Sequence, residues 1–496
     1  MRRRIALLLP GARVAREYRR AWVRPDLVAG VALVALLVPQ GMAYAELAGL
    51  PPVTGLYATV LALVAYALFG PSRILVIGPD SALSPIVFAA IVPLLARDAT
   101  PAERVALAAM LAILMGVICL AAGAFRFGVL ADLLSAPTRI GYLNGLAVAI
   151  LVSQLPKLFG FSTDADGVVA ELRAFVTGVA DGKTNATALA IGVACLVVVV
   201  GFRVVRPRVP GVLVAVVGAT VAVALLDLTA RGVAVVGAIP QGLPRAAWPG
   251  VSWSDTGPLL LAAVGAAFIT IADTVAHSRV FAERGEHIDA NHEIAALGVA
   301  NVATGLFQGM PVSASASRTA VAAANGARSQ LTGVVGALGI AAMLVWFGDL
   351  TEFLPTASLA AIVIAASFVL FDIPALTRLL RVRRSEFALA VVAAAGVIFV
   401  GVLQGIAIAA ALSLADFVRR AWRPYNVALG RIDGRKGYHD IARHPEARQV
   451  PGLVIFRFDA PLFFANAQLL ADDVLAAVAE GAAPLPVRWV VIDAEG

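Results

Sequence analysis

Proline and serine recur together inside two long apolar stretches of the chain, "GPDSALSP" from Gly78 and "PVSASASRTA" from Pro311. Glycine and proline interrupt a helix, and interrupted backbone at membrane depth is tolerated only where protein buries it or where it lines a cavity. Ser81 follows such a break and opens an apolar helical run, as an N-cap residue does. A helix that begins there directs free N–H groups and about half a positive charge at the cavity. Two such helix starts facing each other predict an anion site.

Hydroxyl groups and a guanidinium follow the second break. Ser315 and Ser317 place hydroxyls at this helix start, and Arg318 adds a permanent positive charge beside them. Together they predict that the second stretch also contacts the anion. Two alternatives stay open: the stretches are kinked packing helices whose small residues allow close contact, and Arg318 extends to the cytoplasmic surface.

A carboxylate lies deep in the apolar stretch "AAFITIADTVAHSR", at Asp273. A charge at the bilayer centre costs at least about 2.5–3.5 kcal/mol, so such residues usually face a transport pathway. We therefore expect Asp273 to line the pathway and to take part in ion coupling, with a helix-contact carboxylate as the alternative. His277 is one turn further on. It is placed to share a proton with Asp273, but a surface histidine at the cytoplasmic end is the favoured interpretation.

Polar residues also occur in the first long apolar run, "VPQGMAYAELAGLPP". Gln40 and Tyr44 are four residues apart and share one face of a helix. Glu46 is rotated well away from that face and would border the pocket from one side. Burial favours the neutral form of a carboxylate, so Glu46 is a candidate proton carrier. A glutamate wetted at the outer mouth of the protein is the alternative.

The composition places these groups in a membrane protein. Hydrophobic residues make up 60% of the 496 residues and charged residues only 14%, whereas soluble domains are nearer half apolar and a quarter charged. The net charge of +7 comes from arginines spread over loops, which does not suggest a nucleic-acid partner. Cys119 and Cys195 are expected to be buried apolar residues. No nucleophile elbow or metal motif occurs, so we expect neither an enzyme nor a bound metal.

Fourteen hydrophobic segments are predicted as helices, with a break at Pro137 in the fifth. They cover 27–49, 52–69, 81–96, 103–122, 129–157, 185–202, 210–228, 257–280, 291–308, 316–325, 330–348, 357–371, 385–401 and 404–421. With the N-terminus inside, the even-numbered loops should be basic. They contain Arg126, Arg139, Arg203, Arg206, Arg208, Arg279, Arg284, Arg328, Arg378, Arg381, Arg383 and Arg384. The pattern predicts cytoplasmic N- and C-termini, with residues 1–26 as an arginine-rich segment against the cytoplasmic membrane surface.

The two halves of the chain share a spaced pattern. Pro79 and Pro311 each open a Pro-x-Ser-Ala motif, and each follows an intramembrane polar residue, Gln40 or Asp273. The offset between halves is 232 residues for the prolines and 233 for the polar residues. Seven helices per half would make the copies inverted, which is the layout of many secondary transporters.

The composition changes after Trp422. Residues 423–449 form a charged stretch that we interpret as a connector. Residues 450–496 contain "GLVIFRFDAPLFFANAQLL" and "VRWVVIDAEG", a pattern of strand, Phe-rich turn, helix and strand. They predict the first part of a small α/β domain.

Two long stretches resemble the sulfate permease (SulP) family of anion transporters. One runs "VPQGMAYAELAGLPPVTGLYATVLALVAYALFGPSR" into "GPDSALS", and the other is "ITIADTVAHSRVFAERGEHIDANHEIAALGVANVATGLFQGMPVSASASRTA". The C-terminal pattern resembles the opening of a STAS domain, the cytoplasmic module of this family. The resemblance implies an all-α polytopic membrane protein with 14 segments in a 7+7 inverted repeat of the uracil-permease type, with broken third and tenth helices. It also implies a core, about 27–122 and 257–348, that moves against a gate, about 129–228 and 357–421, within a transport domain of 27–422.

The resemblance also carries site residues by position. It implies that the anion contacts Gln40, Tyr44, Asp80, Ser81, Ala82, Asp273, Ser315, Ser317 and Arg318. Two residues depart from the family pattern. Family members usually have an apolar residue at the position of Glu46, which favours proton coupling. An acid at Asp80 would repel an anion unless it is protonated or turned away.

The sequence and the resemblance together predict a secondary transporter of small anions in a bacterial inner membrane. The favoured substrates are a dicarboxylate or sulfate, taken up with protons. Alternatives are a sodium-coupled bicarbonate carrier and an anion exchanger or channel. No cofactor is expected beyond the coupling ion, H⁺ or Na⁺, which Glu46 and Asp273 would bind. Expected partners are the anion, the lipid bilayer, a second copy in a homodimer and a regulatory protein at the STAS domain.

Overall fold

The computed structural model describes residues 11, 18–96, 99–128, 135–163, 165, 167–205, 210–282, 288–422, 424–460, 462–464, 466–480 and 486–493. Most of the segment predicted at the membrane surface lies outside these residues, as does the start of the helix predicted from residue 129. The chain forms two compact units, Met1–Ala410 and Ala411–Gly496, and each is described by itself.

All fourteen predicted segments correspond to helices. Those of the first half are α3 (Val23–Leu47), α4 (Pro52–Phe69), α5 (Ser84–Ile91), α6 (Pro101–Ala124), α7 (Ala136–Leu158), α9 (Ala186–Val205) and α10 (Gly211–Leu225). Those of the second half are α11 (Trp253–Phe281), α12 (Ala290–Leu306), α13 (Ala316–Ala324), α14 (Leu331–Trp346), α15 (Thr356–Leu370), α17 (Arg384–Ala395) and α18 (Val402–Trp422). Within the described ranges, six helices are long and apolar enough to cross a membrane, and shorter apolar helices accompany them.

Two further helices, α8 (Val168–Ala180) and α16 (Ile373–Val382), were not predicted. Both mix charged and apolar residues, so a search for continuous apolar runs overlooks them. Helix α7 is not broken at Pro137 as we predicted. Pro137 lies in the first turn of α7, where the missing N–H and fixed φ of proline are tolerated. The proline therefore begins the described helix.

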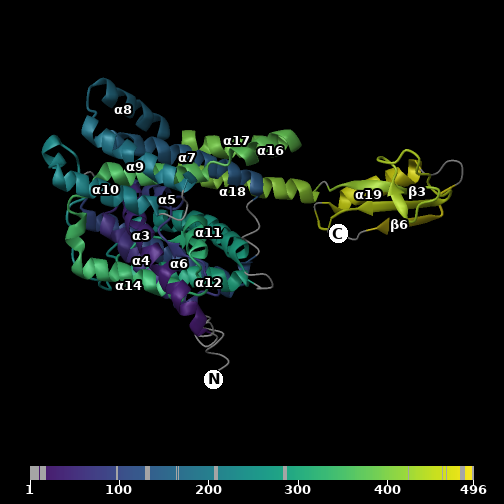
Figure 1. Cartoon of the computed structure of the whole chain (residues 1–496). Helices are drawn as coiled ribbons and strands as arrows, with labels where there is room; N and C mark the ends of the chain where they lie inside the picture. The colour runs from purple at the N-terminus through teal and green to yellow at the C-terminus, as the bar shows by residue number, and fades with distance from the viewer. Residues whose placement is uncertain are drawn as a thin grey trace. The chain divides into compact units, whose positions relative to one another are not determined.

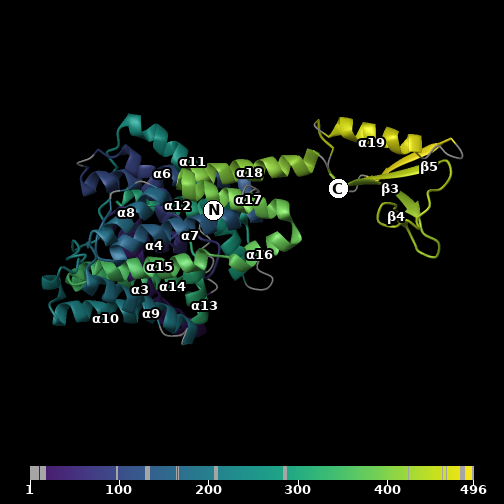
Figure 2. The same cartoon turned by 90° about the horizontal axis from the view of Figure 1, so that it is seen from above.

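Helices of the first unit pack in two groups. In one group α3 packs on α4 and α14, and α12 packs on α6 and α4 (Figure 1). In the other, α7 packs on α15 and α17, and α9 on α10 and α15 (Figure 2). Small residues permit the close approach: a Cβ added at Gly55 would lie 1.9 Å from the Gly41 carbonyl oxygen on the neighbouring helix.

A buried carboxylate ties the start of α3 to the start of α14. The Asp26 side chain is fully buried. One of its oxygens accepts from the Arg328 and Ser329 backbone N–H groups at 2.7 and 3.1 Å and from the Thr332 hydroxyl at 3.1 Å. The other accepts from the Ser329 hydroxyl at 2.6 Å and the Tyr18 hydroxyl at 3.1 Å. Asp26 thereby holds the loop that connects α13 to α14.

We expect Asp26→Ala to destabilise the transport unit by about 3 kcal/mol, because several buried donors lose their acceptor together. The measurement is thermal unfolding of purified protein in detergent. Asp372→Ala is the matched control, since Asp372 caps α16 by accepting from one backbone N–H, that of Ala375, and such a cap contributes about 1 kcal/mol. Equal decreases of the unfolding temperature in the two variants would contradict a special role for Asp26.

The second unit contains a mixed four-stranded sheet in the order β4-β3-β5-β6. Its strands are β3 (Asn426–Arg431), β4 (Tyr438–Asp440), β5 (Leu453–Phe458) and β6 (Trp489–Asp493), and α19 (Ala467–Glu480) connects β5 to the parallel β6. Helix α19 lies along one side of the sheet (Figure 2), and the side chains of Val454, Phe456 and Phe458 form a core with Leu470 and Ala477 of this helix. The predicted strand, turn, helix and strand are all present.

The charged stretch 423–449 is more than the connector we predicted, because it supplies β3 and β4. These strands pair antiparallel with each other and β3 pairs antiparallel with β5. Their charged residues lie mostly in the turns and at exposed positions, so the composition of this stretch resembles that of a loop.

Candidate anion site

Residues far apart in the sequence meet where the two proline–serine stretches lie. Strand β1 (Ile77–Gly78) pairs antiparallel with β2 (Ser313–Ala314). The Ser315 N–H donates to the Val76 carbonyl at 3.1 Å. The Thr319 hydroxyl accepts from the Val76 N–H at 3.0 Å and donates to the Ser315 carbonyl at 2.7 Å. The helix starts of α5 and α13 are thus fixed to one another.

Arg318 is buried at this junction. Its side chain is 1% exposed, and one terminal nitrogen donates to the Gly78 carbonyl at 3.2 Å. The same nitrogen lies 3.6 Å from a carboxylate oxygen of Asp80, whose side chain is 18% exposed. The guanidinium therefore faces the interior at β1, which argues against the alternative that Arg318 extends to the cytoplasmic surface.

Asp80 organises the start of α5. Its carboxylate accepts from the Ala82 N–H at 3.0 Å, and its carbonyl accepts from the Ser84 N–H and hydroxyl at 2.9 and 2.8 Å. Ser81 is not the N-cap that the sequence suggested, because residues 81–83 form a turn and the helix begins at Ser84 with Leu83 in the cap position. The pairing with Arg318 explains how an acid is accommodated here, since the two opposite charges compensate each other.

Three hydroxyl groups belong to segments next to the ion pair, and of these residues Ser315 and Tyr44 are buried whereas Ser317 is exposed. Ser315 and Ser317 have their oxygens 3.1 Å apart. The Tyr44 hydroxyl, buried on α3, interacts with Ser81 and with both members of the ion pair. Gln40 lies one turn earlier on the same helix, and its side-chain oxygen is buried without a hydrogen-bond partner among the described residues. Unpartnered buried polar atoms concentrate at functional sites.

Asp273 approaches the junction from α11. It is partly buried and lies within electrostatic range of Arg139 and Asp80. His277, one turn along, is not at the surface as we favoured from the sequence. It is partly buried, it forms a hydrogen bond with the Ala314 backbone of β2, and its Nδ1 has no partner in the described structure.

Glu46 is the predicted site residue that the structure sets apart. It lies in the last turn of α3 and is partly buried. Among the described residues, Lys157 in the last turn of α7 lies within electrostatic range of Glu46. Within the described part of the chain, no hydrogen bond or ion pair joins Glu46 to the cluster around Arg318.

The sequence interpretation missed several residues at the junction. Arg139 was counted only as a loop charge, and Tyr142 and Thr319 were not singled out. A signal existed for the first two, since Arg139 and Tyr142 are three residues apart and share a helix face. Thr319 carries no such signal, because only the fold brings it to Val76.

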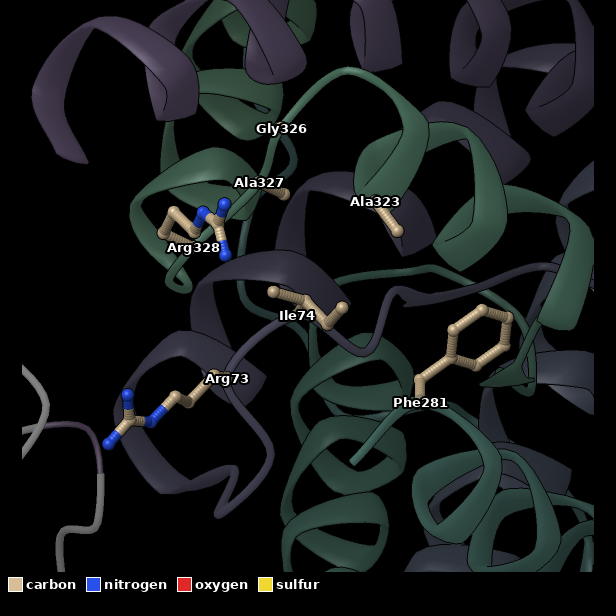
Figure 3. Close-up of a pocket in the computed structure, with 7 residues that line it drawn as sticks. All are labelled: Arg73, Ile74, Phe281, Ala323, Gly326, Ala327 and Arg328. Carbon is tan, nitrogen blue, oxygen red and sulfur yellow. The ribbon is translucent and has the colours of Figure 1, made fainter. Parts of the chain in front are cut away.

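A separate cavity of about 220 Å³ lies at the ends of α11 and α13 (Figure 3). It is lined by Arg73, Ile74, Phe281, Ala323, Gly326, Ala327 and Arg328. None of the residues predicted from the sequence to bind the anion lines it.

Two paired helix starts and a buried arginine lie inside a bundle of apolar helices, as in a multi-pass membrane protein. Residues 23–394 match the model of the Sulfate permease family. A probable sulfate transporter of Mycobacterium tuberculosis is 42% identical over 488 residues, which cover 98% of this chain and 86% of that protein. The chain therefore belongs to the sulfate permease (SulP) family, as the resemblance implied, and is an anion transporter rather than an enzyme.

Solved structures show the same fold. The overall structure of SLC26A9 superposes with a TM-score of 0.88 at 23% identity and covers 99% of this chain and 82% of that chain. The transmembrane domain of a cyanobacterium bicarbonate transporter, BicA, superposes with a TM-score of 0.69 at 22% identity and covers 79% of this chain and 98% of that chain. The C-terminal unit is consistent with a STAS domain.

The β1–Arg318 contact yields a testable prediction. A Cβ added at Gly78 would lie 2.7 Å from an Arg318 terminal nitrogen, so Gly78→Ala must displace the buried guanidinium. We expect the KM for the transported anion to rise about tenfold, the loss expected for one weakened hydrogen bond to a charged group. Initial uptake rates in proteoliposomes measure this. Gly218→Ala on α10, where an added Cβ meets nothing within 4 Å, should leave the KM unchanged, and an equal KM in both variants would refute the prediction.

Proposed function

We propose that this protein is a proton-coupled secondary transporter that takes up sulfate or a dicarboxylate. The anion would bind between the helix starts of α5 and α13, in contact with Gln40, Tyr44, Ser81, Ala82, Ser315, Ser317 and Arg318. The observation that carries the proposal is the antiparallel β1–β2 contact, which brings both helix starts to the buried Arg318. The name of the mycobacterial relative supports sulfate as the first substrate to test.

The charge balance of the site suits reversible binding. Because Asp80 compensates Arg318, attraction of the anion rests largely on the dipoles of the two helix starts. A carrier must release its substrate, and partial charges hold a dianion less tightly than an uncompensated arginine would.

The proposed architecture is a 7+7 inverted repeat in which a core, about 27–122 and 257–348, moves against a gate, about 129–228 and 357–421, in an elevator-like or rocking motion. The two packing groups of helices support this division. The β1–α5 and β2–α13 segments have the same strand-then-helix order in the two halves, which supports the repeat and the assignment of broken third and tenth helices.

Asp273 and Glu46 are the proposed coupling residues. Asp273 is the better placed, since its charge interacts with Asp80 at the anion site. Proton binding at Asp273 would remove a negative charge next to the incoming anion and so favour its entry. Glu46, beside Lys157, would act at a distance from that site.

The remaining assignments concern the cellular setting. We place the protein in a bacterial inner membrane with both termini in the cytoplasm, as the distribution of arginines over the loops favours. A homodimer and a regulatory partner at the STAS unit complete the proposal.

Uptake into proteoliposomes tests the proposed function. Labelled sulfate, succinate and bicarbonate are offered with an inward proton gradient, an inward sodium gradient or no gradient, to the wild type and to Glu46→Gln. Accumulation of sulfate or succinate driven only by protons supports the proposal. Sodium-driven accumulation of bicarbonate alone would overturn it. Loss of proton-driven uptake in Glu46→Gln would assign coupling to Glu46, whereas unchanged uptake would leave Asp273 as the coupling residue.

A further inference from the structure

Helix α7 packs closely against α17 through two glycines. A Cβ added at Gly141 would lie 2.0 Å from the Ala390 carbonyl oxygen of α17, and one added at Gly145 would lie 2.7 Å from the Ala394 carbonyl oxygen. The backbones of α7 and α17 are therefore in direct contact. Tyr142 follows Gly141 by one residue, so it is rotated about a quarter turn away from α17.

The Tyr142 side chain is buried within the main core of the first unit. It is 1% exposed and belongs to the same buried cluster as Tyr44, Ile77 and Ala82. Its hydroxyl has no hydrogen-bond partner among the described residues. A buried hydroxyl without a partner costs about 1–3 kcal/mol, so such a group calls for an explanation.

The surroundings of the Tyr142 hydroxyl are those of the anion site. It lies within electrostatic range of Asp273 and Asp80, although neither carboxylate accepts a recorded hydrogen bond from it. Arg139, one turn earlier on the same helix face, interacts electrostatically with Asp273 and His277. A hydroxyl and a guanidinium from α7 thus lie within electrostatic range of the carboxylates of the site.

We propose that the Tyr142 hydroxyl donates a hydrogen bond to the transported oxyanion, so that α7 closes the site from the side of the proposed gate. The inference rests on the proposed anion site between α5 and α13. The helix starts contact the anion from one side, and a tetrahedral or planar oxyanion keeps acceptor oxygens free on the other. The Tyr142 hydroxyl supplies a hydrogen-bond donor on that side, and packing fixes the position of the Tyr142 ring. The hydroxyl is then satisfied when the anion is bound, and the site discriminates in favour of oxyanions.

The experiment compares the wild type with Tyr142→Phe, which removes only the hydroxyl. Binding of labelled sulfate, succinate, bicarbonate and chloride to the purified full-length protein is measured by equilibrium dialysis, and proteoliposome uptake gives KM and Vmax. Tyr57→Phe, on α4 and partly exposed, is the matched control. Thermal unfolding of each variant shows whether the fold is intact.

We expect Tyr142→Phe to weaken oxyanion binding and raise the KM by roughly tenfold, the loss of one hydrogen bond to a charged group, with Vmax and the unfolding temperature close to wild type. Chloride binding should fall less. Equal affinities in Tyr142→Phe and wild type for whichever anion the wild type binds would overturn the inference, as would a lower unfolding temperature with unchanged KM. If the wild type binds bicarbonate but neither sulfate nor succinate, the proposed substrate is overturned. The bicarbonate affinity of Tyr142→Phe then still tests the role of the Tyr142 hydroxyl. A wild type that binds none of the four would overturn both.

Discussion

Replacement of Arg318 by methionine is expected to lower the initial rate of anion uptake about a hundredfold, which corresponds to about 3 kcal/mol of lost anion binding, because the anion loses a charged donor and meets an uncompensated carboxylate. Methionine fills much of the same volume but donates nothing to the Gly78 carbonyl or to the anion. It also leaves the Asp80 carboxylate uncompensated at the start of α5, where it repels an anion. Initial uptake rates in proteoliposomes, normalised to the inserted protein, measure the effect.

The partner variants separate charge from packing. Asp80→Asn leaves Arg318 without its counter-charge, so we expect tighter anion binding and slower release, seen as a lower KM together with a lower Vmax. The double variant Asp80→Asn/Arg318→Met removes both charges, so thermal stability should recover relative to Arg318→Met, and uptake should recover in part because both helix starts remain. Uptake by Arg318→Met at near the wild-type rate would contradict the assignment of Arg318 to the anion site.

Substitution of Asp273 by asparagine is expected to abolish proton-driven accumulation while leaving anion exchange in place. Asparagine preserves the shape of the side chain but neither binds nor releases a proton. In a one-proton symport, each unit of pH gradient supports about tenfold accumulation, and this factor should vanish in the variant. The measurement is the accumulation ratio at a fixed gradient, together with exchange of labelled for unlabelled anion in its absence.

An exposed acid provides the control for Asp273. Asp289 caps α12 by accepting from the backbone N–H groups of Asn291 and His292, and asparagine serves nearly as well in that role. Asp289→Asn should therefore accumulate anion as the wild type does. If Asp273→Asn accumulates anion with a proton gradient as strongly as Asp289→Asn, coupling does not pass through Asp273.

Much of the fold was accessible from the sequence because apolar run length is a direct physical requirement of a membrane helix. The fourteen predicted segments correspond to helices for this reason, including the short α5 and α13. Helices α8 and α16 escaped prediction, since charged residues interrupt their apolar runs. Strands β3 and β4 escaped because a short strand with exposed charges has the composition of a loop.

Only part of the candidate site could be predicted from the sequence. Proline, glycine and serine at two matched positions predicted interrupted helices. In the structure, these two positions are joined by the pairing of β1 with β2. No sequence pattern indicates that Asp80 pairs with Arg318, because that contact joins residues 238 positions apart in the chain. His277 was misjudged for a related reason. Its position along α11 is near the end of an apolar run, but β2 covers it there.

The most direct measurement of the central claim is a map of a bound sulfate analogue. Selenate, which is heavier than sulfate and has the same charge and shape, is added to the purified protein, and its position is determined by anomalous diffraction. We predict density between the helix starts of α5 and α13, within hydrogen-bonding distance of Ser81, Ser317 or their backbone N–H groups. Density only in the cavity between Arg73 and Arg328, with none at the helix starts, would contradict the account.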